Sequence, residues 1–157
     1  MRTSHKKHFL NLVVIFLAFV SISPRVVAQE SMPKTDRQLV YAAAEDYILG
    51  LYNADPDRIE RSVDTLLRKI GYYDYNGESY SHMPMTYQQL YELSGTWNAK
   101  GDRANADSPK KIEIYEVHDR TASLKLTAEW GIDFMHLSKT DGKWKILNIM
   151  WQTSPEE

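Results

Sequence analysis

Tyrosine side chains are concentrated in one stretch of the sequence, between residues 72 and 97. A tyrosine offers an apolar ring together with a hydroxyl group that needs a hydrogen-bond partner. Gathered around a cavity, such side chains could hold a planar or amphipathic ligand; the alternative is ordinary packing of a helix and the loop before it. Three aromatic residues of this stretch are candidate ligand contacts: Tyr73, Tyr75 and Trp97.

Two histidines are further candidates for the pocket. His82 lies before an expected helix, and His136 lies within an expected strand that also carries Ile132 and Phe134. A histidine in either place can also be a hydrogen-bonded packing residue. Neither belongs to a helical i, i+4 pair or to a known metal motif, so we expect no metal site.

Asp133 and Asn148 are polar residues within otherwise apolar strand faces. A buried polar group costs free energy unless it is hydrogen-bonded. These two side chains could line the pocket and meet a ligand or water, or they could bond to neighbouring backbone. Both alternatives remain open from the sequence.

Several kinds of chemistry are excluded by composition. The sequence contains no cysteine, which rules out disulfides, thiolate catalysis and zinc–thiolate sites. It also contains no phosphate-binding glycine loop, dinucleotide fingerprint or nucleophile elbow. We therefore expect no cofactor.

The first 28 residues have the pattern of a secretion signal. Arg2, Lys6 and Lys7 precede an apolar run over residues 9–22, and small residues follow, ending at Ala28. The run is short for a membrane span, which needs about 20 residues. We expect cleavage after Ala28, export to the periplasm or the medium, and a mature domain over residues 29–157 that has no contact with the membrane.

The expected mature domain is acidic. Removing residues 1–28 leaves 15 lysines and arginines against 21 aspartates and glutamates, a formal net charge of −6. Such a charge repels phosphate backbones, so a nucleic-acid partner is not expected.

Three helices are expected in the first half of the domain. Thr35 with Gln38, and Thr86 with Gln89, match the capping box that begins a helix. A helix between them should begin near Pro56, with a buried stripe at helical spacing. That stripe comprises Ile59, Val63, Leu66, Leu67 and Ile70.

Four strands are expected after a polar loop over residues 98–111. The strands cover residues 112–117, 122–128, 132–139 and 143–151, and Asp141 with Gly142 is typical of a tight hairpin turn. This order predicts an α+β fold with helices on one face of an antiparallel sheet. Because both faces of the last strand are largely apolar, we also expect a homodimer that buries the outer face of the sheet.

Two stretches of the sequence resemble the nuclear-transport-factor-2-like superfamily, and within it the branch of putative lumazine-binding proteins. They are FMHLSKTDGKWKILN at residues 134–148 and MTYQQL at residues 85–90, followed by Trp97 and Asn98. The resemblance extends over about residues 39–152. It implies a cone-shaped fold, a curved sheet wrapped by helices around an internal pocket. The chain has Asp64 and Thr65 where the branch often has His-Pro.

The same resemblance assigns roles to two residues. Asp74, three residues before Gly77, is similar in place to the general base of ketosteroid isomerases in this superfamily, and Tyr47 to their oxyanion donor. A carboxylate would then remove a proton beside a carbonyl while a phenol stabilises the enolate. The proline that follows the base in those isomerases is Tyr75 here. Asp74 could equally be a solvated turn residue, and Tyr47 a core residue.

Three functions are therefore open. The first is an exported protein that binds a small, partly aromatic or apolar molecule. The second is an isomerase, cyclase or dehydratase that uses Asp74 and a tyrosine. The third is an interaction module whose sheet surface binds a partner. Fold alone does not choose among them.

Overall fold

The computed structural model describes residues 34–77 and 79–154, which belong to one compact unit, Pro33–Glu157. The expected secretion signal and its cleavage site lie outside these residues. The elements follow the order α1 (Asp36–Tyr52), α2 (Pro56–Ser62), β1 (Val63–Asp74), β2 (Tyr80–Met85), α3 (Tyr87–Ser94), β3 (Lys111–Val117), β4 (Thr121–Ala128), β5 (Gly131–Thr140) and β6 (Lys143–Gln152). No helix among the described residues has the length and apolar character needed to cross a membrane.

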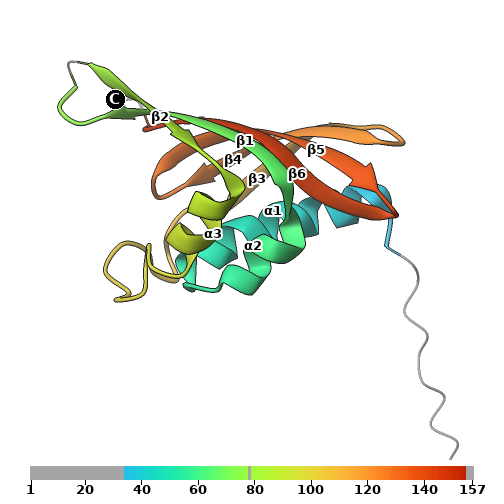
Figure 1. Ribbon diagram of the computed structural model, residues 1–157, viewed down its shortest axis with the longest axis horizontal. Helices are drawn as coiled ribbons and strands as arrows, with labels where there is room; N and C mark the ends of the chain where they lie inside the picture. The colour runs from blue at the N-terminus through green and yellow to red at the C-terminus, as the bar shows by residue number, and fades with distance from the viewer. Residues whose placement is uncertain (1–33, 78, 155–157) are drawn as a thin grey trace, which may run out of the picture. The chain divides into compact units, whose positions relative to one another are not determined.

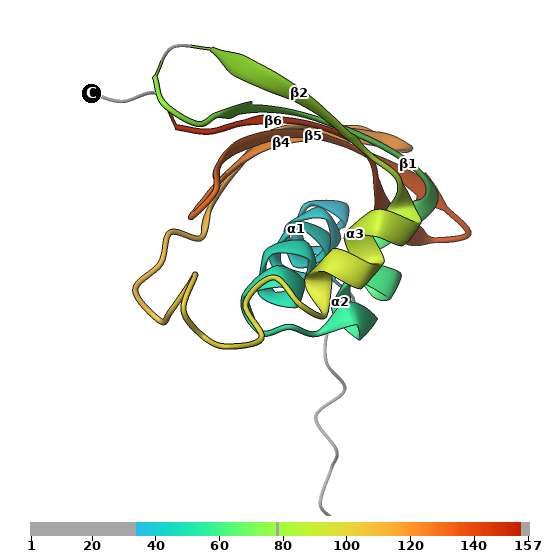
Figure 2. The same cartoon turned by 60° about the vertical axis from the view of Figure 1, so that its left-hand side comes forward.

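The three helices pack on one face of a curved six-stranded sheet (Figure 1, Figure 2). The strand order is β2-β1-β6-β5-β4-β3, and the sheet is mixed because β1 runs parallel to β6 while the other pairs are antiparallel. The predicted α+β architecture is confirmed. Two of its strands, β1 and β2, were not predicted, and they lie between the second and third helices in the chain.

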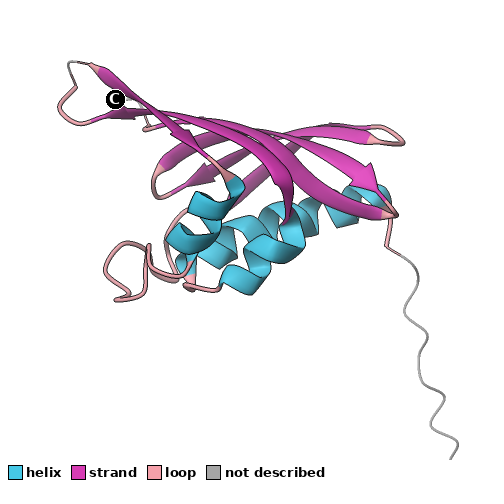
Figure 3. Cartoon of the chain, viewed as in Figure 1, coloured by secondary structure: helices cyan, strands magenta, loops and turns pink. Residues whose placement is uncertain are grey.

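The second helix is shorter than predicted. It begins at Pro56 as expected but ends at Ser62, and the chain continues without a loop into β1 (Figure 3). Every second residue of β1 from Leu67 onward is buried beneath the helices, namely Leu67, Lys69 and Gly71. Leu66, which precedes them, is 76% exposed. The helical spacing of the apolar residues was therefore misleading. Pairing with β6 and the strand preference of the β-branched and aromatic residues after Ser62 override it.

Local signals placed the other boundaries correctly. The Thr35–Gln38 and Thr86–Gln89 capping boxes are both present, with reciprocal hydrogen bonds between side chain and backbone. Asp141 has a φ of 51° and Gly142 a φ of 75°, which matches the predicted hairpin turn.

A β-bulge in β6 explains why both of its faces looked apolar. Asn148 pairs with His136 and Ile146 with Leu137, so Leu147 is an extra residue. The buried positions change parity there, from Trp144 and Ile146 to Ile149 and Trp151. The buried apolar face of the strand therefore follows the bulge, which is why both of its faces are largely apolar in the sequence.

One close approach depends on a glycine. Trp151 lies across Gly71 of the neighbouring strand, and a Cβ built on Gly71 would come within 2.1 Å of the indole. The missing side chain lets the indole lie flat against β1. This brings Trp151 beside Lys69, whose Nζ atom is 5.5 Å from the centre of the ring.

Candidate functional site

An apolar cavity of about 240 Å³ lies between the inner face of the sheet and α3. Aromatic and aliphatic side chains form most of its wall, and two cationic side chains contribute to it. The lining residues are Leu51, Lys69, Tyr73, Met83, Met85, Leu90, Leu93, Trp97, Arg103, Trp130 and Trp151. A mostly apolar concavity with a few polar groups is the usual form of a small-molecule site.

Lys69 is the central polar residue of this cavity. The alternation of β1 points its side chain inward, where it is only 6% exposed. Its Nζ atom donates a hydrogen bond of 2.6 Å to the hydroxyl oxygen of Tyr47 on α1. A lysine amine that contacts both a cavity and a buried phenol is available to a bound molecule.

Asp133 is the carboxyl group near this amine. It is fully buried on β5, and its Oδ1 atom accepts a hydrogen bond of 3.2 Å from the indole nitrogen of Trp130. Its Oδ2 atom is also buried and has no hydrogen-bond partner within the described part of the chain. Lys69, Tyr47 and Asp133, which we call the buried triad, thus join three elements of the fold.

Burial dominates the proton affinities of the buried triad. It lowers the pKa of Lys69, and the negative charge of Asp133 partly opposes this effect. Burial raises the pKa of Asp133, while Lys69 and the Trp130 and Tyr47 side chains favour its ionised form. The pKa of Tyr47 is raised well above its ordinary value by burial and then by Asp133. Each shift favours the neutral form of its group, because burial penalises the charged form.

Stacked aromatic rings form the wall opposite β1. Trp97 contacts Trp130 edge-on, with ring centres 5.3 Å apart, and stacks on Tyr52 at 5.9 Å. The Tyr52 hydroxyl donates to the carbonyl of Pro109 and accepts from the backbone N–H of Glu129. These bonds hold the aromatic wall against the loop before β3 and against the β4–β5 turn.

Asn98 holds the loop that carries Arg103. Its amide nitrogen donates to the carbonyls of Tyr52 and Ala104, and its oxygen accepts from the backbone N–H groups of Arg103 and Ala104. The Arg103 guanidinium lies 5.9 Å from the centre of the Trp97 ring. A second cation is therefore fixed at the wall of the cavity.

Four of the predicted site residues meet at this cavity. Tyr73 and Trp97 line it, and Tyr47 and Asp133 interact with Lys69 beneath it. Lys69 was missed because residues 63–70 had been assigned to a helix. The available signal was its position between Leu67 and Gly71, because strand alternation puts these three residues on one face.

Four other predicted residues lie away from the cavity wall. Tyr75 is 71% exposed, although its ring contacts Tyr73 at 4.3 Å. His82 is exposed and lies beside the ring of Tyr72. His136 is exposed on β5, and the half-buried Asn148 is its neighbour on β6.

Asp74 lies at the end of β1, not beside Tyr47. Its Oδ1 atom accepts hydrogen bonds from the backbone N–H groups of Asn76 and Gly77, so this carboxylate organises the hairpin turn. It is five positions further along β1 than Lys69, about 16 Å along a strand. The structure thus places Tyr47 beside Lys69 and Asp133. The role of Asp74 as a general base stays a prediction.

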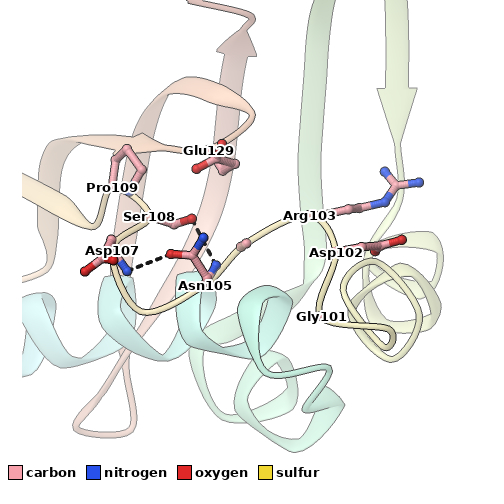
Figure 4. Close-up of a pocket in the computed structure, with 9 residues that line it drawn as sticks. Gly101, Asp102, Arg103, Asn105, Asp107, Ser108, Pro109 and Glu129 are labelled. Carbon is pink, nitrogen blue, oxygen red and sulfur yellow. Dashed lines mark hydrogen bonds between the residues drawn. The ribbon is translucent and has the colours of Figure 1, made fainter.

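A second hollow lies between the surface loop that includes Gly101 and Asn105 and the β4–β5 turn, which contributes Glu129 (Figure 4). Its polar groups bond to one another: the N–H of Asn105 donates to Ser108, and the N–H of Asp107 donates to Asn105. It contains no aromatic ring, and we do not assign a ligand to it. Among the described residues, no cluster of three or more histidine and carboxylate side chains could hold a metal.

The coupling within the buried triad can be measured with a double-mutant cycle. We expect Lys69→Met and Asp133→Asn each to lower the free energy of unfolding by about 3 kcal/mol, because each leaves the other buried group without its counterpart. The double variant should lose clearly less than the sum of the two. Urea denaturation at pH 7 measures all four proteins, and strictly additive losses would contradict the coupling.

Comparison with known proteins places this architecture in a family. The chain is similar to nuclear-transport-factor-2-like proteins of solved structure from Silicibacter pomeroyi (19% identity, 76% of this chain and 99% of that one, TM-score 0.56) and Shewanella baltica (17%, 79% and 100%, TM-score 0.57). A similar protein from Cytophaga hutchinsonii has 15% identity over 76% of this chain and 99% of that one, with a TM-score of 0.54. No curated protein matches the chain. The sequence pattern of the family described as putative lumazine-binding matches residues 35–152, and the chain belongs to this family.

Proposed function

We propose that this chain is an exported binding protein for a small, partly apolar or aromatic molecule. The observation that carries the proposal is the apolar cavity with the Lys69 amine in its wall. Export rests on the basic and apolar pattern of residues 1–28. The match to a family described as putative lumazine-binding supports a ligand-binding function without fixing the ligand.

The size and chemistry of the cavity limit the ligand. At about 240 Å³ it lies below the usual range of small-molecule pockets, so it suits a molecule of one or two rings. The edges and faces of Trp97 and Trp130 favour a planar body. Lys69 uses one of its three possible donors on Tyr47, which leaves donors for an oxygen atom on the ligand.

An isomerase that uses Asp74 receives less support than the binding function. Its proposed base stabilises a turn and lies far along β1 from the phenol. An enzyme at this site would instead use the buried triad, because these are the titratable side chains whose pKa values are shifted beside the cavity.

We also propose that two copies associate through the outer face of the sheet. Ile70, Met150 and Phe134 are adjacent in the register of β1, β6 and β5, and they are 37%, 53% and 45% exposed. Apolar side chains that line up across three strands on a solvent-exposed face favour association. Pro84 extends the row on β2. A second copy suits this row because a two-fold axis would pair it with itself.

The binding proposal predicts a co-purifying molecule. Native mass spectrometry of gently purified protein should show an added mass that disappears on denaturation. Met85→Trp, which fills the cavity, should abolish this mass. The control Leu66→Trp adds the same bulk at an exposed position outside the cavity and should retain it. The same mass on the Met85 variant, or no added mass on any protein, would contradict the proposal.

The association proposal predicts a dimer by light scattering at micromolar concentration. Met150→Glu should produce monomers, since it places a charge between Ile70 and Phe134 in the apolar row. Tyr115→Glu changes an exposed aromatic residue on the edge strand β3 and should leave the dimer intact. A monomeric parent protein would refute the association.

A further inference from the structure

The Lys69 amine is held in an unusual way for a buried lysine. None of the ion pairs among the described residues includes it, although Asp133 is near enough to raise its pKa. Its one hydrogen bond is to a neutral phenol, and its side chain forms part of a cavity wall. A structural lysine would instead be expected to form a direct ion pair with a carboxylate.

We propose that Lys69 forms an imine with the carbonyl group of an aldehyde or ketone bound in the cavity. This inference rests on the proposed binding function and adds the chemical class of the ligand. Desolvated lysines in apolar pockets are the nucleophiles that form Schiff bases with carbonyl compounds. An apolar cavity of about 240 Å³ has room for a small aromatic or aliphatic carbonyl compound.

The reaction needs no oxidant or cofactor. The lone pair of the neutral amine attacks the carbonyl carbon; the C–N bond forms, and the π electrons move to oxygen. Tyr47 donates its proton to that oxygen and takes one from nitrogen, which gives a carbinolamine. A second proton transfer through Tyr47 releases the hydroxyl group as water while the nitrogen lone pair forms the C=N bond. The balance is amine plus carbonyl compound giving imine plus water.

The neighbours of Lys69 suit these steps. The Tyr47 hydroxyl is 2.6 Å from Nζ, within reach of an atom bonded to it. Asp133 would stabilise a protonated imine, whereas burial lowers the pKa of the free amine and so favours its neutral form. The other ionisable side chains at the cavity are Tyr73 and Arg103.

Reductive trapping tests the inference. Purified protein is incubated at pH 7 with benzaldehyde and sodium cyanoborohydride, and the product is analysed by intact mass and peptide mapping. We expect one benzyl group, located on Lys69, before exposed lysines react. Lys69→Met and Lys69→Arg should lose this rapid labelling, whereas Lys143→Met, at an exposed turn, should keep it. Tyr47→Phe should slow it by about 100-fold, since it removes the proton donor.

A parallel measurement separates the inference from the binding function on which it depends. Benzyl alcohol has the same ring but no carbonyl group, and its binding should change the fluorescence of Trp97, Trp130 and Trp151. Benzyl alcohol binding with no preferential labelling of Lys69 would overturn the imine and leave the binding function intact. Absence of both the fluorescence change and the labelling would contradict both proposals. Because peptide mapping of the unmutated protein locates the adduct, the test does not depend on the variants folding.

Discussion

The rest of the structure depends on the burial of one amine. Lys69 is almost completely removed from water, and a lone charge in such a place would cost several kcal/mol. The fold meets this cost with Tyr47 from α1 and Asp133 from β5, so helix, first strand and central sheet must come together for the amine to be tolerated. Gly71 contributes by letting Trp151 lie beside it. The same arrangement leaves the Lys69 side chain in the wall of an apolar cavity, where it can serve a ligand.

Much of the fold was predictable because its signals are local. Capping at Thr35 and Thr86, and the turn at Asp141 and Gly142, involve residues three positions apart or closer, and all appear as expected. The start of β1 was not predictable in this way. The choice between helix and strand after Ser62 depends on β6, some 80 residues later, and the apolar spacing there fits either period. The bulge at Leu147 is likewise a property of the strand pair, and no single strand reveals it.

The candidate site shows the same division. Tyr73, Trp97 and Asp133 were identified because aromatic residues and polar residues in apolar strands stand out in a sequence, and they do lie at or beneath the cavity. His82, Tyr75 and His136 had equally suitable side chains but face away from it. Lys69 has an ordinary sequence context, and its role follows from the strand that carries it. Residue type therefore suggested the chemistry, whereas topology determined which residues share the cavity.

The state of the Lys69 amine is the most direct test of this account. An NMR titration of the lysine side-chain amines would resolve Lys69 from exposed lysines such as Lys143 and Lys100. We expect Lys69 to lose its proton at clearly lower pH than those residues, because burial lowers its pKa more than Asp133 raises it. A Lys69 amine that titrates together with the exposed lysines would show that it is solvated or ion-paired. This result would contradict its role as a desolvated amine in the wall of the cavity.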